Sequence, residues 1–184
     1  LDHFLITTLS RAAVNNFVRD ETIHKALGDK PTRIPIRLIF NEIDLNFQTR
    51  YVAFQGRTIW CQGDGEIAVR EGKDRQCPCP NRERGYDEKR DRQGPVCKIN
   101  GRLQVMIDGA AGVGGVWVMR TTSWNTVQGL ISSMALIASI TGGRLAGVPL
   151  SLTVSPKQAT DPSGKQVTVY VVGIESLSAG RAFD

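Results

Sequence analysis

The sequence predicts an α+β fold with a mainly antiparallel sheet, and three observations support this prediction. Segments that alternate apolar and polar residues, as strands do, occur on both sides of one long segment with helical periodicity. Turn-forming residues separate neighbouring strand segments, so most strand pairs should be antiparallel. All four cysteines lie in one highly charged stretch, residues 61–97, which divides the strand segments. This order also fits a ferredoxin-like or RNA-recognition-like core that carries the cysteine stretch as an insertion.

The length of the chain sets the expected domain organisation. At 184 residues it can form one domain with a real core, but hardly two. We expect a single domain over residues 1–184, with an inserted four-cysteine loop at residues 61–97. No run approaches the roughly 18 apolar residues of a membrane span, so no membrane partner is expected. No secretory signal is visible, and we expect a cytoplasmic protein.

The N-terminal region indicates helix. Ser10 is a candidate cap for a first segment, Asp20 or Thr22 for a second, and Gly28 for the C-terminal end. His24 lies beside the apolar face and is expected to be a half-exposed helix residue rather than a ligand. The apolar positions of the two segments are Val14, Phe17, Val18, Ile23 and Leu27.

Strands are predicted from alternation along much of the remaining chain. The clearest helix begins after Ser123 as its cap and ends at Gly142 and Gly143, with an apolar stripe directed at the core. Asn100 and Gly101 indicate a turn, whereas residues 41–50 show no clear pattern. The predicted strands cover residues 34–40, 51–54, 58–60, 103–107, 116–121, 148–154 and 167–174, with tight turns at residues 55–57 and 161–164.

The cysteine stretch is rich in Gly, Pro and charged residues, and it cannot bury enough apolar surface to fold by itself. Four thiolates around one Zn²⁺ would supply the missing stabilisation. A site closed by four sulfurs leaves no open coordination position, so this zinc would be structural and not catalytic. Two disulfides, or thiols with no partner, remain as alternatives. The predicted ligands are Cys61, Cys77, Cys79 and Cys97.

The net charge of +5 is located outside the cysteine stretch, which holds eight basic and eight acidic residues. The remaining 15 basic and 10 acidic residues suit a phosphate-bearing partner. Arg37 should project away from the core because it alternates with Ile36. Tyr51 and Trp60 could stack on bases, or could equally pack the sheet. The candidate nucleic-acid-binding residues are Arg33, Arg37, Arg50, Tyr51, Arg57, Trp60 and Arg102.

No catalytic constellation is visible in the sequence. The glycine-rich stretch at residues 108–115 lacks the G-K-[ST] end of a phosphate-binding loop and is predicted to be a hairpin connection. Ser132 and Ser133 lie outside any G-x-S-x-G motif. The two histidines, His3 and His24, are far in sequence from the cysteines. We therefore predict that the chain is not an enzyme.

The four cysteines, the segment TTSWNTVQGLISSMALIASITGGRLAGVPLSLTVSP and the closing VTVYVVGIE together resemble the recombination-directionality-factor-like family of phages and integrative elements. Some members of that family are labelled only "hydrolase or metal-binding protein". The resemblance implies a zinc-binding, non-catalytic accessory protein of a phage or mobile element. Its partners would be DNA and a recombinase such as a serine integrase, or other protein subunits.

A second function class remains open beside the resemblance. The chain could bind single-stranded nucleic acid, or be a subunit of a nucleoprotein complex, including a CRISPR-type ribonucleoprotein. A metallohydrolase is disfavoured because a four-cysteine site is closed. A homo-oligomer is left open.

Overall fold

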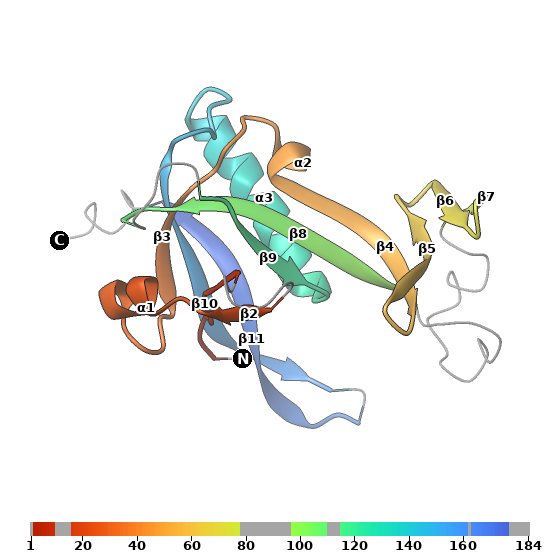
Figure 1. Ribbon diagram of the computed structural model, residues 1–184, viewed down its shortest axis with the longest axis horizontal. Helices are drawn as coiled ribbons and strands as arrows, with labels where there is room; N and C mark the ends of the chain where they lie inside the picture. Colours follow the sequence, from red (N-terminus) through yellow and green to blue (C-terminus); the bar gives the residue numbers. More distant parts are fainter. Residues whose placement is uncertain (1, 10–15, 78–96, 110–114, 162, 177–184) are drawn as a thin grey trace.

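The computed structural model describes residues 2–9, 16–77, 97–109, 115–161 and 163–176. Its main feature is a nine-stranded sheet with the order β11-β10-β3-β8-β4-β5-β6-β7, in which β9 also pairs with β8 (Figure 1). All strand pairs within it are antiparallel. The strands are β3 (Arg33–Arg37), β4 (Phe47–Gln55), β5 (Thr58–Gly63), β6 (Ile67–Arg70), β7 (Lys73–Gln76), β8 (Cys97–Ile107), β9 (Trp117–Thr121), β10 (Pro149–Thr160) and β11 (Gln166–Ser176).

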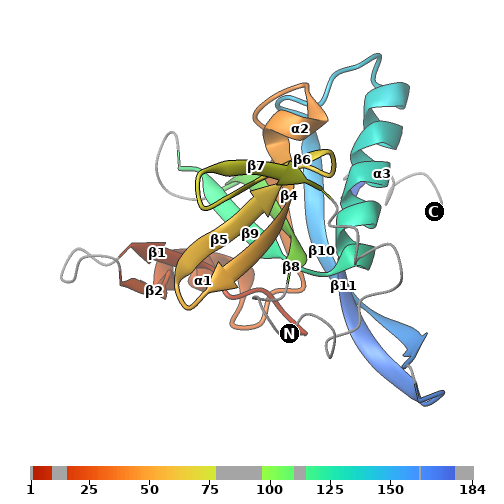
Figure 2. The ribbon, with the colours of Figure 1, turned by 90° about the vertical axis from the view of Figure 1, so that its right-hand side faces the viewer.

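The α+β class with a mainly antiparallel sheet is confirmed, but the ferredoxin-like or RNA-recognition-like arrangement is not observed. Such a core packs two helices on a small sheet. Here one long helix, α3 (Trp124–Ile140), lies along one side of a much wider sheet (Figure 2). Among the described residues, no helix is long and apolar enough to cross a membrane.

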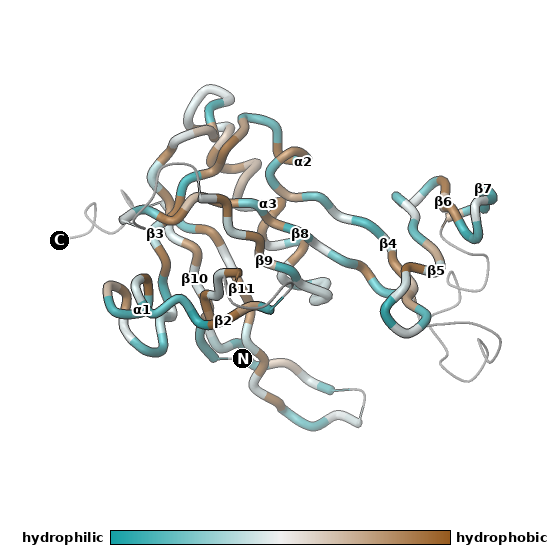
Figure 3. The backbone as a smooth tube through the Cα atoms, viewed as in Figure 1, coloured by the Kyte–Doolittle hydropathy of each residue, from teal (hydrophilic) through white to brown (hydrophobic). Residues whose placement is uncertain are grey.

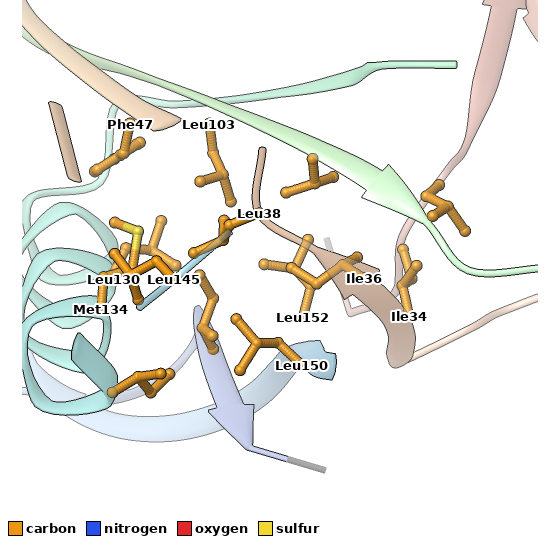
Figure 4. Close-up of a cluster of buried hydrophobic side chains, with 14 of the residues drawn as sticks. Ile34, Ile36, Leu38, Phe47, Leu103, Leu130, Met134, Leu145, Leu150 and Leu152 are labelled. Atoms are coloured by element: carbon orange, nitrogen blue, oxygen red, sulfur yellow. The ribbon is translucent and has the colours of Figure 1, made fainter. Parts of the chain in front are cut away.

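The helix α3 forms where its cap and periodicity predict it. The Ser123 hydroxyl accepts a hydrogen bond from the Thr126 N–H at 3.3 Å, which satisfies a donor that the first helical turn leaves open. Leu130 and Met134 are fully buried on the side of α3 that faces the sheet. They pack with side chains of β3 and β8 in the main core, including Ile36 (Figure 4).

The predicted hairpins are also present. β4 and β5 flank the turn at residues 55–57, and β10 and β11 pair without a register shift from Leu150 opposite Ser176 to Thr160 opposite Gln166. The strands β8 and β9 pair across the glycine-rich stretch, as expected. The unassigned residues 41–50 form a short helix, α2 (Ile43–Asn46), and the beginning of β4.

The N-terminal helix prediction is only half correct. The second segment forms α1 (Glu21–Leu27), with Asp20 as its N-cap and Gly28 at its C-terminal end. Phe17 and Val18, however, lie in β2 (Phe17–Arg19), which pairs with β1 (Thr7–Leu9). Both residues have high strand propensity, and the pairing with β1 overrides a weak helical periodicity. Ser10 and Val14 lie outside the described residues.

His24 is buried, not half-exposed. Its Nε2 accepts a hydrogen bond from the Ile6 N–H at 3.1 Å, and its Nδ1 lies 3.2 Å from the Gly28 carbonyl oxygen. The imidazole therefore joins the N-terminal segment to α1. This role is structural.

The Asn100-Gly101 turn prediction is wrong, because both residues lie inside the continuous strand β8. Gly101 does not form a turn, and its lack of a side chain instead allows close packing. A Cβ atom on Gly101 would lie 2.6 Å from Cζ of Phe47, which is closer than carbon atoms approach. The absent side chain lets the Phe47 ring lie against the backbone of β8.

The first part of the cysteine stretch also differs from the prediction of a loop without structure of its own. Residues 67–76 form β6 and β7, which extend the sheet beyond β5. The long strands β4 and β8 run side by side from the main core to this end of the molecule (Figure 1). Hydrophobic segments near β5 and β6 lie next to the hydrophilic β7 (Figure 3).

Candidate nucleic-acid interface and cysteine cluster

Three cysteines lie at the end of the sheet that β4, β5 and β8 form. Ala53 of β4 is directly opposite Cys61 of β5 on one side and Cys97 of β8 on the other. Directly opposed residues of antiparallel strands project from the same face, so these side chains share one face of the sheet. Cys61 and Cys77 are buried with Ala53 and Ala68, and Cys97 packs against them.

Small residues make room for the Cys77 side chain on this face. A Cβ atom on Gly63 would lie 2.5 Å from Cys77 Sγ and 2.8 Å from the Ala68 Cβ. Gly63 is directly opposite Ala68, so Cys77 lies over a cross-strand pair of very small residues. A side chain at position 63 would displace the sulfur.

The aromatic residues Tyr51 and Trp60 also pack against this cluster and are half-buried. The Arg70 guanidinium carbon lies 4.2 Å from the centroid of the Trp60 ring, a cation–π contact. These two residues therefore pack the sheet, which is one of the two alternatives that the sequence left open. They are not on the face that carries the exposed arginines described below.

The structure leaves the zinc prediction untested. Among the described residues, no three His, Cys, Asp or Glu side chains are grouped so that they could hold a metal ion. The predicted fourth ligand, Cys79, lies outside the described residues. The described residues place Cys61, Cys77 and Cys97 on one side of the sheet, where they pack with the small residues Ala53, Gly63 and Ala68.

Two of the predicted nucleic-acid contacts are engaged in ion pairs within the protein. Arg37 does project away from the core, but its Nε donates to Asp108 Oδ1 at 2.8 Å and its Nη1 to the Gly147 carbonyl at 2.6 Å. Arg33 pairs with Glu175 across the sheet. Arg37 in particular ties β3 to two later segments, so its guanidinium has a structural role within the protein, and its assignment as a phosphate contact stays a prediction.

Arg50 and Arg102, in contrast, lie together on the exposed face of the central strands. The core face of β8 carries the odd-numbered residues, such as Leu103, and the even-numbered residues project to the opposite side. The cross-strand pairs place Arg50 opposite Asn100, and Arg102 opposite Gln48. Both arginine side chains are exposed. Arg57 is exposed in the turn before β5, apart from this group.

Two further cations complete this surface, which we call the basic face and define as Arg50, Lys98, Arg102 and Arg120. Lys98 is opposite Val52, and Arg120 of β9 is directly opposite Arg102 of β8. All four side chains are exposed. None forms a direct ion pair with a carboxylate among the described residues, although Arg50 lies near enough to Asp64 for its charge to add to the backbone hydrogen bonds that lower the pKa of that carboxyl.

The Arg102–Arg120 pair is unfavourable for folding. Like charges directly opposite each other in an antiparallel pair destabilise a sheet, by roughly 0.2–1 kcal/mol on the scale of cross-strand interactions. Neither arginine is neutralised by a described carboxylate, whereas Arg33 and Arg37 on the neighbouring strand are. An arrangement of this kind suits a polyanion that supplies the missing negative charge.

Lys98 and Arg120 were missed from the sequence. Alternation alone shows that Lys98, Asn100 and Arg102 share one face of a strand. It does not show which residues of β4 and β9 stand opposite, because register depends on strand pairing over long sequence distances.

Comparison with models of protein families identifies the family of the chain. The Gp3-like family, described as recombination directionality factor-like, matches residues 1–177. The chain belongs to this recombination directionality factor-like family. Searches of curated proteins and of solved structures found no match.

Membership of the recombination directionality factor-like family agrees with the resemblance inferred from the sequence. The family description indicates an accessory role in the recombination of phages and mobile elements. Recombination directionality factors act typically with DNA and recombinase proteins, and are generally not catalysts.

Proposed function

We propose that the chain is a non-catalytic accessory protein that acts in recombination of a phage or mobile element, and that it contacts the DNA backbone through the basic face. The observation that supports this most directly is the group of four exposed cations on adjacent strands, none of which is in a direct ion pair with a described carboxylate. Family membership supplies the biological setting. The recombinase, such as a serine integrase, is the proposed protein partner.

The chemistry of the basic face favours phosphate contact over base reading. Its neighbours in the cross-strand rows are the polar Gln48 and Asn100 and the buried Val52, and no aromatic side chain stands in these rows in the described strands β4 and β8. Arginine forms two parallel hydrogen bonds with a phosphate, and each neutralised phosphate releases condensed counterions. Affinity should therefore depend steeply on salt and only weakly on sequence.

The alternative function, binding of single-stranded nucleic acid, requires aromatic side chains on which bases stack. Tyr51 and Trp60 were the candidates, and they pack on the cysteine face instead. A DNA-binding assay that compares single- and double-stranded DNA distinguishes the proposed function from this alternative. Tighter binding of the single strand by the basic face would favour the alternative.

We also propose that Cys61, Cys77, Cys79 and Cys97 hold one structural Zn²⁺. This proposal is supported by the position of Cys61, Cys77 and Cys97 on one face and by the small residues that accommodate Cys77. A tetrathiolate zinc would stabilise the end of the sheet, where few other apolar residues are buried. Elemental analysis of the purified chain should give about one zinc per monomer.

Recombination assays test the function directly. The chain is added to a reaction that contains the recombinase of the same element and DNA carrying the recombination sites. We expect the ratio of excision to integration to change, with no cleavage of DNA by the chain alone. If the ratio of excision to integration is unchanged by a preparation that is folded and whose zinc content has been measured, the proposed role is contradicted.

A further inference from the structure

The exposed side of α3 carries no charged residue. Of the 184 residues, 23 are Lys or Arg and 18 are Asp or Glu, yet none of these occurs in the 17 residues of the helix. Large apolar side chains are exposed on it: Trp124 is 52%, Leu136 64% and Ile140 71% accessible. The exposed positions are Trp124, Asn125, Gln128, Ser132, Ala135, Leu136, Ser139 and Ile140.

A helix at a protein surface ordinarily carries charged or other polar residues on the side away from the core, whereas a helix that is apolar all round is covered on all sides. The exposed side of α3 lies between these cases, because it has no charge and combines uncharged polar residues with large apolar ones. We propose that a second copy of this chain covers it, so that two α3 helices pack antiparallel about a two-fold axis at Ser132. This proposal does not rest on the proposed function.

The spacing of side chains along α3 is self-complementary in that arrangement. A two-fold axis at Ser132, the central residue of the helix, brings Trp124 of one copy opposite Ile140 of the other. The same operation brings Gln128 opposite Leu136. Large apolar residues therefore meet at both ends of the contact. The small residues near the centre, including Ala135, allow the two helix backbones to approach closely.

Charge also favours a second copy as the occupant. The chain has a net charge of +5, so contacts between charged surfaces of two copies would oppose like charges. The exposed side of α3 can be buried against itself with no charge removed from water. The basic face lies on the side of the sheet opposite the core residues that pack with α3. Two copies joined through α3 would thus direct their basic faces away from each other.

Sedimentation velocity over about 1 to 100 µM chain tests the proposal, since specific contacts of ordinary size dissociate in or below this range. We expect a dimer in the wild type. Ser132→Glu would place two carboxylates against each other at the axis and should weaken the dimer at least tenfold. Glutamate is a good helix former at this exposed position, so the fold should persist. Gln158→Glu, an equal charge change on exposed β10, is the control and should remain dimeric.

Mild oxidation of single-cysteine additions tests the axis itself. Ser132→Cys should form an intermolecular crosslink well above the wild-type background from the native cysteines. Gln128→Cys, one turn away on the same face, should crosslink much more slowly because it faces Leu136 of the other copy. A wild type that stays monomeric to 100 µM, a Ser132→Glu variant that dimerises like the control, or equal crosslinking at both positions would each overturn the proposal.

Discussion

Replacement of Arg102 and Arg120 by alanine tests the basic face most sharply. The two residues stand directly opposite each other on β8 and β9, and both are exposed. Their removal eliminates two of the four cations of the face and also relieves the repulsion between them. The fold should therefore be retained, with a change in stability within about 1 kcal/mol.

The expected magnitude follows from counterion release. If all four cations contact phosphates, the slope of log affinity against log salt is about −3.6, from roughly 0.9 per contact in duplex DNA. Between 50 and 200 mM salt, affinity then falls about 150-fold in the wild type. The double variant keeps two contacts, so its slope should be about −1.8 and its fall about 12-fold.

Fluorescence anisotropy with a labelled duplex, repeated at several salt concentrations, measures both slopes. Lys157→Ala with Lys165→Ala removes the same charge from the exposed β10–β11 hairpin and is the matched control. This control should keep the wild-type slope. A well-folded Arg102/Arg120 variant with an unchanged slope, or an equal loss in the control, would refute the phosphate-contact reasoning.

Further predictions concern the cysteine cluster, the core and pH. Gly63→Ala should displace Cys77 and lower the zinc content of the purified chain, whereas Gly173→Ala, whose added Cβ would meet Thr153 Oγ1 at 3.5 Å, should leave it unchanged. Leu130→Ala removes a fully buried side chain and should lower the free energy of unfolding in urea by about 2–5 kcal/mol. Hydrogen bonds from the backbone N–H groups of Ile67 and Glu66 lower the pKa of Asp64, so the stability that its carboxylate contributes should be present above about pH 4 and lost as pH falls below that. The difference in urea midpoint between wild type and Asp64→Ala should accordingly shrink in acid, and a difference independent of pH would contradict this.

Elements with strong local signals could be predicted from the sequence. The cap at Ser123 and the 3.6-residue period located α3, and the turn residues located the β4–β5 and β10–β11 hairpins. Local signals failed where a distant partner decided the outcome. Phe17 forms a strand because β1 pairs with it, and Gly101 continues a strand because the Phe47 ring needs its space.

In the candidate site, too, local patterns predicted some features, whereas contacts between distant parts of the chain could not be predicted. Alternation correctly placed Arg37 on the side away from the core, but its partner Asp108 lies 71 positions further along the chain. No local pattern predicts that ion pair, so the sequence alone does not show that the Arg37 guanidinium already has a partner within the protein. Conversely, Arg120 joins Arg102 only through the register of β8 and β9. Faces of single strands are readable from sequence, whereas surfaces that span several strands require the register.

The most direct test of the proposed function is a recombination time course with three proteins: the wild type, the Arg102→Ala/Arg120→Ala variant and the Lys157→Ala/Lys165→Ala control. Each is added to the recombinase of the same element at a salt concentration where the two variants differ in DNA binding. We predict that wild type and control shift the balance between excision and integration equally, and that the basic-face variant shifts it much less. A basic-face variant that is folded and as active as the wild type would contradict the proposed role of this surface.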